Sequence, residues 1–196
     1  MDDLTARVMR LQRAAWAVRR AGPRPCRLPF ALALMTDETA QPDVVSATER
    51  LPRGAPILVV FRHYRTPASE RAALAGAARR AARVRGHLLV VAGGGGEGAH
   101  NARAPGVVSV SVHDLAEGAA KRALRPSVGL VSPVFPTNSH PGAPSLGPAR
   151  AAGIAARLPY PAFALGGADA DSARRLVGTP FQGIAALGAW ADDRAG

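Results

Sequence analysis

The sequence contains few of the residues that build crosslinked, metal-clustered or membrane-spanning proteins. Its 196 residues include a single cysteine, Cys26, which excludes an internal disulfide framework and any zinc or iron–sulfur site made from several cysteines. Aromatic residues make up 5% of the chain, and no basic run is interleaved with stacking rings as in single-strand nucleic-acid binders. No apolar run approaches the roughly 20 residues of a membrane span. We therefore expect no nucleic-acid partner and no membrane partner.

The residues that are present give a globular composition with an excess of positive charge. Apolar residues account for 47% and charged residues for 20% of the chain, and this length suffices for one buried core. The net charge is +11, and Lys121 is the only lysine. Such charge attracts nucleic acids and phosphates, but the arginines are scattered along polar helix faces, which favours ordinary solvated surfaces.

Residues 1–27 are predicted to form a basic amphipathic helix and a linker. Positions 3–20 place apolar side chains on one stripe, and the run from Gly22 to Pro29 ends the helix. The stripe permits two packings, against the bottom of the following domain or in a homodimer. Asp2 and Asp3 do not resemble the start of a secretory signal, so we expect a cytoplasmic protein, with an organellar transit peptide as the alternative.

Residues 28–196 are predicted to form a small TIM (β/α)8 barrel. Seven continuous apolar runs, typical of buried parallel strands, lie at 30–35, 56–61, 87–92, 106–112, 127–135, 160–167 and 181–190. Helical stretches between them are expected at 44–51, 68–84, 114–124, 148–157 and 171–177, and Asp114 with Glu117 matches a capping box. An eighth strand has to fit within the short segment 93–105, so the barrel is abbreviated around its third to fifth strands and its closure is left open.

The residues that directly follow the apolar runs are polar or glycine almost throughout. In parallel α/β folds the chemistry lies at the carboxyl ends of the strands. The candidates at these ends are Thr36, Asp37, Arg62, His63, Ser111, His113, the run 137–142, Gly166, Gly167 and Gly188.

Three segments resemble a known family. They are SVSVH at 109–113, SPVFPTNSHPGAPSLG at 132–147, and ALGG at 164–167 followed by GIAALG at 183–188. In the same order they are similar to the G-x-S-x-H, G-P-V-F-x-T-x-T-K-P-G, A-I-G-G and G-V-A-V-I-S motifs of the thiamine phosphate synthase family, which includes the TenI-type thiazole tautomerases. The resemblance spans roughly residues 30–190. It implies a TIM barrel that binds a small phosphorylated thiazole, joined in the transferase members by a pyrimidine diphosphate and magnesium.

The departures from the family pattern concentrate on the half of the site that holds the diphosphate. Of the Q-x-R-x-K motif only Arg62 survives, and the other expected residues are replaced at Val60, Tyr64, Ala92, Gly93, His140 and Gly188. Ionising a diphosphate requires cations, or magnesium held by carboxylates, to stabilise the developing charge. We therefore expect no resident metal or cofactor, with magnesium required only if the chain is a synthase.

The monophosphate half is better preserved. Gly166, Gly167 and Gly188 can bring backbone N–H groups close to an anion, in the region where barrels commonly hold phosphate; the alternative is that the paired glycines only form a tight turn. By resemblance, Thr137 and Ser139 contact the thiazole carboxyl or its neighbourhood. Their alternative role is a proline-bracketed turn.

His113 is the candidate acid and base. An imidazole titrates near neutral pH and can remove and return a proton, and the resemblance implies this role in the tautomerase branch; a structural hydrogen bond to the backbone is the alternative. His140 is the candidate second proton carrier or phosphate contact, unless it is simply solvated. Arg62 and Ser111 are the remaining candidates for binding substrate or phosphate.

Three functions are consistent with these residues. The first is a thiamine-biosynthesis protein that binds a thiazole phosphate and carries out proton transfer of the tautomerase kind through His113. The second is thiamine phosphate synthase itself, with a rearranged diphosphate site. The third is a non-catalytic paralogue that keeps only ligand binding.

Overall fold

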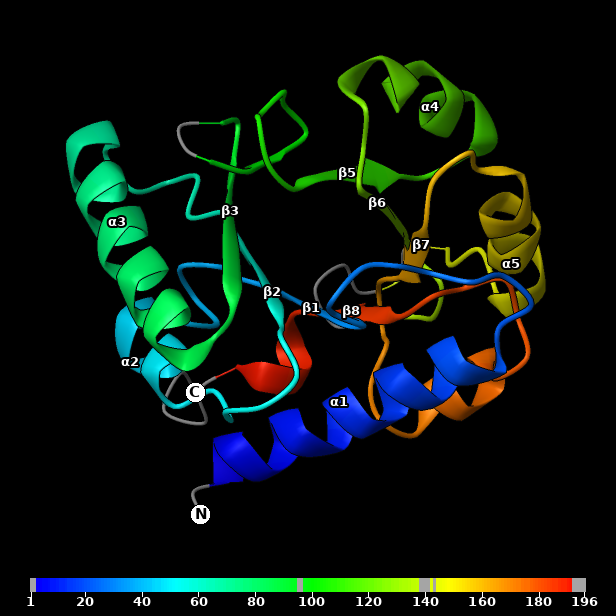
Figure 1. Cartoon of the computed structure of the whole chain (residues 1–196), viewed down its shortest axis with the longest axis horizontal. Helices are drawn as coiled ribbons and strands as arrows, with labels where there is room; N and C mark the ends of the chain where they lie inside the picture. Colours follow the sequence, from blue (N-terminus) through cyan, green and yellow to red (C-terminus); the bar gives the residue numbers. More distant parts are fainter. Residues whose placement is uncertain (1–2, 95–96, 138–141, 143, 192–196) are drawn as a thin grey trace.

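Eight parallel strands close into a barrel in the computed structural model, which describes residues 3–94, 97–137, 142 and 144–191. The strands are β1 (Leu32–Met35), β2 (Leu58–Phe61), β3 (Leu88–Ala92), β4 (Ala99–His100), β5 (Val108–Val112), β6 (Val128–Val131), β7 (Ala162–Ala164) and β8 (Ile184–Ala186). Each strand pairs with the next, and β1 pairs with β8 (Figure 1). The predicted TIM-barrel fold is confirmed, and the barrel is closed.

The closure depends on β4, which has only two residues. Ala99 and His100 pair with β3 on one side and β5 on the other. A side chain at Gly98 would place its Cβ 2.7 Å from Val90 Cγ1 and 2.8 Å from the carbonyl oxygen of Val107, so glycine allows the chain to pass between its neighbours. The short strand ends on His100 and delivers this side chain to the rim of the barrel.

The helices lie outside the barrel, close to the bounds that the sequence predicts. They are α1 (Asp3–Ala21), α2 (Val44–Glu49), α3 (Ala68–Arg85), α4 (Leu115–Ala120) and α5 (Pro148–Arg157), with 3-10 helices η1 (Lys121–Leu124), η2 (Ser172–Leu176) and η3 (Gly188–Trp190). The helix expected at 171–177 is thus a short 3-10 helix. None of the helices in the described ranges combines the length and the hydropathy that a bilayer span requires.

The barrel interior is a packed core. Side chains from alternate strand positions fill it, with large contributions from Phe30, Leu58, Leu130 and Phe163. The rings of Phe30 and Phe163 meet edge to face, with their centroids 5.8 Å apart. Because this plug lies below the carboxyl ends of the strands, the polar residues that follow the strands surround a cavity closed at its base.

Helix α1 packs against the barrel wall beside β1, next to η2 and η3 (Figure 1). The predicted stripe is buried at Leu4, Val8, Leu11, Ala15 and Val18. Arg19 extends from the same helix and donates hydrogen bonds to the carbonyls of Gln182, Leu28 and Phe30. The apolar stripe therefore packs against other parts of the same chain. Arg19 binds the segments that lead into β1 and β8.

Candidate functional site

A cavity of about 980 Å³ opens at the carboxyl ends of the strands. Seven of the predicted site residues line it, namely Arg62, Ser111, His113, Thr137, Gly166, Gly167 and Gly188. Ser139 and His140 fall outside the described residues. The cavity thus brings together candidates that are as many as 126 positions apart in the chain, from Arg62 to Gly188.

The sequence prediction missed several polar residues of the cavity, and two of them lie at β4. His100 is the last residue of β4, Asn101 follows it, and both line the cavity. The segment that contains them has no apolar run, so no strand end could be assigned there. Their position within 93–105, where an eighth strand had to fit, was the one signal that could have pointed to them.

His113 is fixed by the beginning of α4. Asp114 caps this helix, and its carboxylate accepts the backbone N–H of Glu117 at 2.7 Å. The carboxylate of Glu117 in turn accepts the backbone N–H of His113 at 2.7 Å and binds His113 Nδ1 at 2.8 Å. The predicted capping box is therefore half formed, because Glu117 reaches back to His113 and not to Asp114.

The charge of Glu117 determines the tautomer of His113. Burial acts to raise the pKa of Glu117, but hydrogen bonds from Lys121 and His113 outweigh it and lower the pKa to about 2. Lys121 Nζ lies 2.5 Å from Glu117 Oε1 and also donates to the carbonyl of Ser111 at 2.8 Å. Because an ionised carboxylate only accepts hydrogen bonds, His113 Nδ1 must carry a proton. In the neutral ring, the lone pair is then on Nε2.

The backbone of two strand ends forms one side of the cavity, which we call the backbone pole (Gly166, Gly167 and Gly188). Gly166 and Gly167 have φ values of +90° and +60°, a region that favours glycine. A Cβ at Gly166 would lie 2.8 Å from Pro133 Cα, and one at Gly167 would collide with the carbonyl oxygen of Pro136. Within the described part of the chain, the backbone N–H groups of these three glycines have no hydrogen-bond acceptor, so they remain able to bind an anion.

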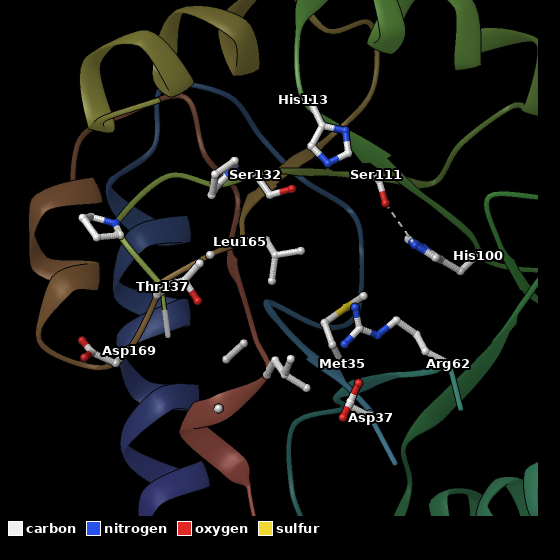
Figure 2. A pocket seen from close by; sticks show the side chains of 18 of the residues that line it. Met35, Asp37, Arg62, His100, Ser111, His113, Ser132, Thr137, Leu165 and Asp169 are labelled. Carbon is white, nitrogen blue, oxygen red and sulfur yellow. Dashed lines mark hydrogen bonds between the residues drawn. The ribbon is translucent and has the colours of Figure 1, made fainter. Parts of the chain in front are cut away.

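The opposite side of the cavity consists of side chains, and we call it the side-chain pole (Arg62, His100, Asn101 and Ser111). Figure 2 shows Arg62, His100 and Ser111 across the cavity from Thr137 and Asp169. Arg62 is anchored on Thr36, whose hydroxyl accepts the Arg62 backbone N–H at 3.0 Å and whose carbonyl accepts Nε at 2.8 Å. The two terminal guanidinium nitrogens have no partner among the residues that the structure describes.

Two carboxylates line the cavity within the described ranges, Asp37 and Asp169. Burial acts to raise the pKa of Asp37, but hydrogen bonds from Thr39 and Ala40 and the charge of Arg62 lower it below its ordinary value. Asp169 Oδ1 already accepts the N–H groups of Asp171 and Ser172. Asp37, one of the predicted strand-end candidates, thus lines the same cavity as Arg62.

Within the described ranges, these two carboxylates are not part of a larger cluster of metal-ligating side chains. Magnesium in proteins is held by oxygen ligands, usually carboxylates, in near-octahedral geometry. Over the described ranges, no group of three or more His, Cys, Asp or Glu side chains could hold a metal. We therefore derive no step through a metal ion.

The fold and the cavity define a (β/α)8-barrel protein with a small-molecule site at the carboxyl ends of its strands, one side of which offers free backbone N–H groups. Residues 97–189 match the family model described as thiamine monophosphate synthase. This match covers somewhat less than half of the chain and agrees with the predicted resemblance to the thiamine phosphate synthase and TenI family.

A solved structure supports the same fold. Thiamine phosphate pyrophosphorylase from Pyrococcus furiosus superposes with a TM-score of 0.67 and 23% sequence identity, over 84% of this chain and 89% of that chain. A search of curated proteins gave no match.

Proposed function

We propose that the chain binds a thiazole monophosphate in this cavity and moves a proton from one position of the ring to another, as a tautomerase does. The observation that carries the proposal is the state of His113. Its Nδ1 is bound to an ionised Glu117, and the ring lines a cavity whose backbone pole is prepared for an anion. A cytoplasmic enzyme of thiamine biosynthesis is consistent with these features.

The proton transfer needs no reactant other than the substrate. His113 Nε2 accepts a proton from the thiazole ring, and the imidazolium is stabilised by the Glu117 carboxylate at 2.8 Å. The same proton is then returned to another ring position. Bonds to hydrogen are broken and formed in equal number, so the reaction is an isomerisation.

The backbone pole gives the substrate its orientation. The N–H groups of Gly166, Gly167 and Gly188 hold the phosphate, and the positions of the first two depend on their close packing on Pro133 and Pro136. With the phosphate fixed, the thiazole ring extends across the cavity toward His113. Thr137 lines the same side and is a further contact for the ligand.

Thiamine phosphate synthase is the second candidate. The description of the family model and the name of the Pyrococcus furiosus structure both favour it. That reaction expels diphosphate, and the loss of one charge-stabilising group costs about 3 kcal/mol of transition-state stabilisation. Here the described side-chain pole offers a single guanidinium to a diphosphate, with its two terminal nitrogens unbound within the described residues, which favours the tautomerase.

The test is an assay of both reactions with the same protein. We expect isomerisation of a thiazole carboxylate phosphate tautomer, followed by NMR in D₂O, and we expect His113→Gln to lower kcat by about 10³-fold while phosphate binding persists. Formation of thiamine phosphate with added magnesium would favour the synthase instead. Ligand binding without either reaction would favour the non-catalytic paralogue.

A further inference from the structure

Helix α1 carries a second row of side chains, apart from its buried stripe. Four of its residues follow one another at helical spacing, namely Met9, Arg13, Trp16 and Arg20. With Gln12 and Ala55 they line a cavity of about 260 Å³, which we call the α1 cavity. We propose that it docks a short acidic segment of another protein, whose apolar side chain enters the cavity while its carboxylates bind Arg13 and Arg20. This inference does not rest on the proposed function, because the two cavities share no lining residue.

Contacts within the chain hold the walls of the α1 cavity in place. Gln12 Nε2 donates to the carbonyl of Ala55 at 2.5 Å, which joins α1 to the segment that precedes β2. Arg19, fixed by three backbone carbonyls, has its guanidinium carbon 4.9 Å from the centroid of the Trp16 ring. The partner's side chain therefore enters a preformed hollow, and little conformational freedom is lost on the side of this chain when it binds.

The size and lining of the α1 cavity favour a single side chain over a small-molecule ligand or a bilayer. Pockets for small molecules measure roughly 300–1,000 Å³, and this cavity lies below that range. Met9, Trp16 and the arginines belong to the residue types that are enriched at protein interfaces. A helix that binds a bilayer inserts a continuous apolar face, whereas the apolar stripe of α1 is buried within the chain.

The charge around the α1 cavity favours an acidic partner. Arg13 and Arg20 are exposed, and neither has a hydrogen bond or an ion pair within the part of the chain that the structure describes. The described residues that line the cavity include no carboxylate, and the net charge of the whole chain is +11. Carboxylates of a partner therefore gain two arginines without breaking an existing ion pair.

The same charge disfavours a second copy of this chain as the occupant. In a two-fold symmetric dimer a surface patch meets itself, so Arg13 and Arg20 of one protomer would lie near the same arginines of its partner. Like charges at such short range repel each other. The apolar stripe, through which the sequence allows a homodimer, is already buried within this chain, where α1 contacts β1, η2 and η3.

The experiment follows the fluorescence of Trp16 while the full chain is titrated with a short peptide of glutamates around one central leucine. The other of the two tryptophans, Trp190, is fully buried and donates to the carbonyl of Met35, so a change in emission reports on the α1 cavity. We expect saturable binding that weakens about fivefold when serine replaces the leucine. Arg13→Gln and Arg20→Gln should each weaken it about threefold.

Arg10→Gln is the matched control, because Arg10 is exposed on the same helix, carries the same charge and does not line the α1 cavity. It should leave the affinity unchanged, and circular dichroism verifies that each variant is folded. Equal losses in all three variants, or equal binding of the two peptides, would reduce the effect to attraction by the net charge and overturn the inference. So would the absence of binding, or a dimer in sedimentation that Arg13→Gln dissociates, because a second copy then occupies the cavity.

Discussion

The two poles of the cavity are built from different parts of the chain, in different ways. The backbone pole uses N–H groups whose position follows from the packing of Gly166 and Gly167 against the loop after β6. The side-chain pole uses an amide, a hydroxyl and a buried imidazole that hold one another in place, together with a guanidinium held by Thr36. The first should respond to changes in packing and be indifferent to pH, whereas the second should respond to charge and protonation.

The largest expected effect concerns the packing of the backbone pole. Gly167→Ala puts a Cβ against the carbonyl oxygen of Pro136 at a φ of +60°, and should lower the free energy of unfolding by about 3 kcal/mol. Urea denaturation measures it. Gly153→Ala, in α5 with open space around it, is the control and should be neutral or stabilising. Equal stability of the two variants would show that the glycine is not required by packing.

The side-chain pole, unlike the backbone pole, should make the free energy of unfolding depend on pH. The pKa of His100 falls to about 4 in the folded state, so the unfolded chain binds more protons than the folded chain between the ordinary histidine pKa and pH 4. Stability is therefore lost as the pH falls through this window, by about 2 kcal/mol for His100. His100→Gln should reduce the difference in unfolding free energy between pH 7 and pH 4.5 by this amount. If His100→Gln leaves the difference between pH 7 and pH 4.5 unchanged, His100 takes up a proton in the folded state over this pH range.

A smaller effect is expected where the two poles meet, at His113. Glu117→Gln removes the charge that holds Nδ1 protonated, and should lower kcat about tenfold with little change in KM. Nitrogen NMR of the labelled histidine should show a shift from the Nδ1–H toward the Nε2–H tautomer. Glu97→Gln, which breaks an exposed pair with Arg83, serves as the control. A normal kcat together with an unchanged tautomer would limit Glu117 to its part in the helix cap.

The smallest expected effect is a charge change beside the backbone pole. Burial acts to raise the pKa of Asp169, but hydrogen bonds from Ser172 and Asp171 lower it below its ordinary value, so a negative charge lines the cavity. Asp169→Asn keeps the acceptor for the turn and should tighten binding of inorganic phosphate about twofold, since the group is exposed. Asp171→Asn, in the same turn but away from the cavity lining, should change the affinity less. A larger gain in phosphate affinity for Asp171→Asn than for Asp169→Asn would show that the phosphate binds elsewhere.

The sequence predicts the backbone pole better than the side-chain pole, for a physical reason. Gly166, Gly167 and Gly188 follow continuous apolar strands, and such runs mark where a strand ends. His100 ends a strand of only two residues, which leaves no periodic signal, and only the register with β3 and β5 brings it to the rim. Its hydrogen bonds to Asn101 and Ser111 depend on side-chain positions that no local pattern specifies.

The residues around His113 show the same limit of prediction from sequence, within a single short segment of the chain. The spacing of Asp114 and Glu117 correctly predicts that a helix begins there. It does not show that the Glu117 carboxylate turns to His113, because that choice depends on Lys121, one helical turn further on, and on its bond to the carbonyl of Ser111. The cap spans four positions, 114–117, whereas the arrangement that orients His113 spans eleven, 111–121.

The hydrogen bonds of Arg19 can be completed only late in the synthesis of the chain. The guanidinium binds the carbonyls of residues 28, 30 and 182. These three hydrogen bonds therefore cannot all form until nearly the whole chain has left the ribosome. In the folded chain the same cation lies over the rings of Trp16 and Phe163, and a nascent chain that lacks residue 182 lacks the last acceptor of Arg19. Chains that end before residue 182 lack β8, so their barrel should stay unclosed beside β1. We expect proteases to degrade such chains more readily than the full chain.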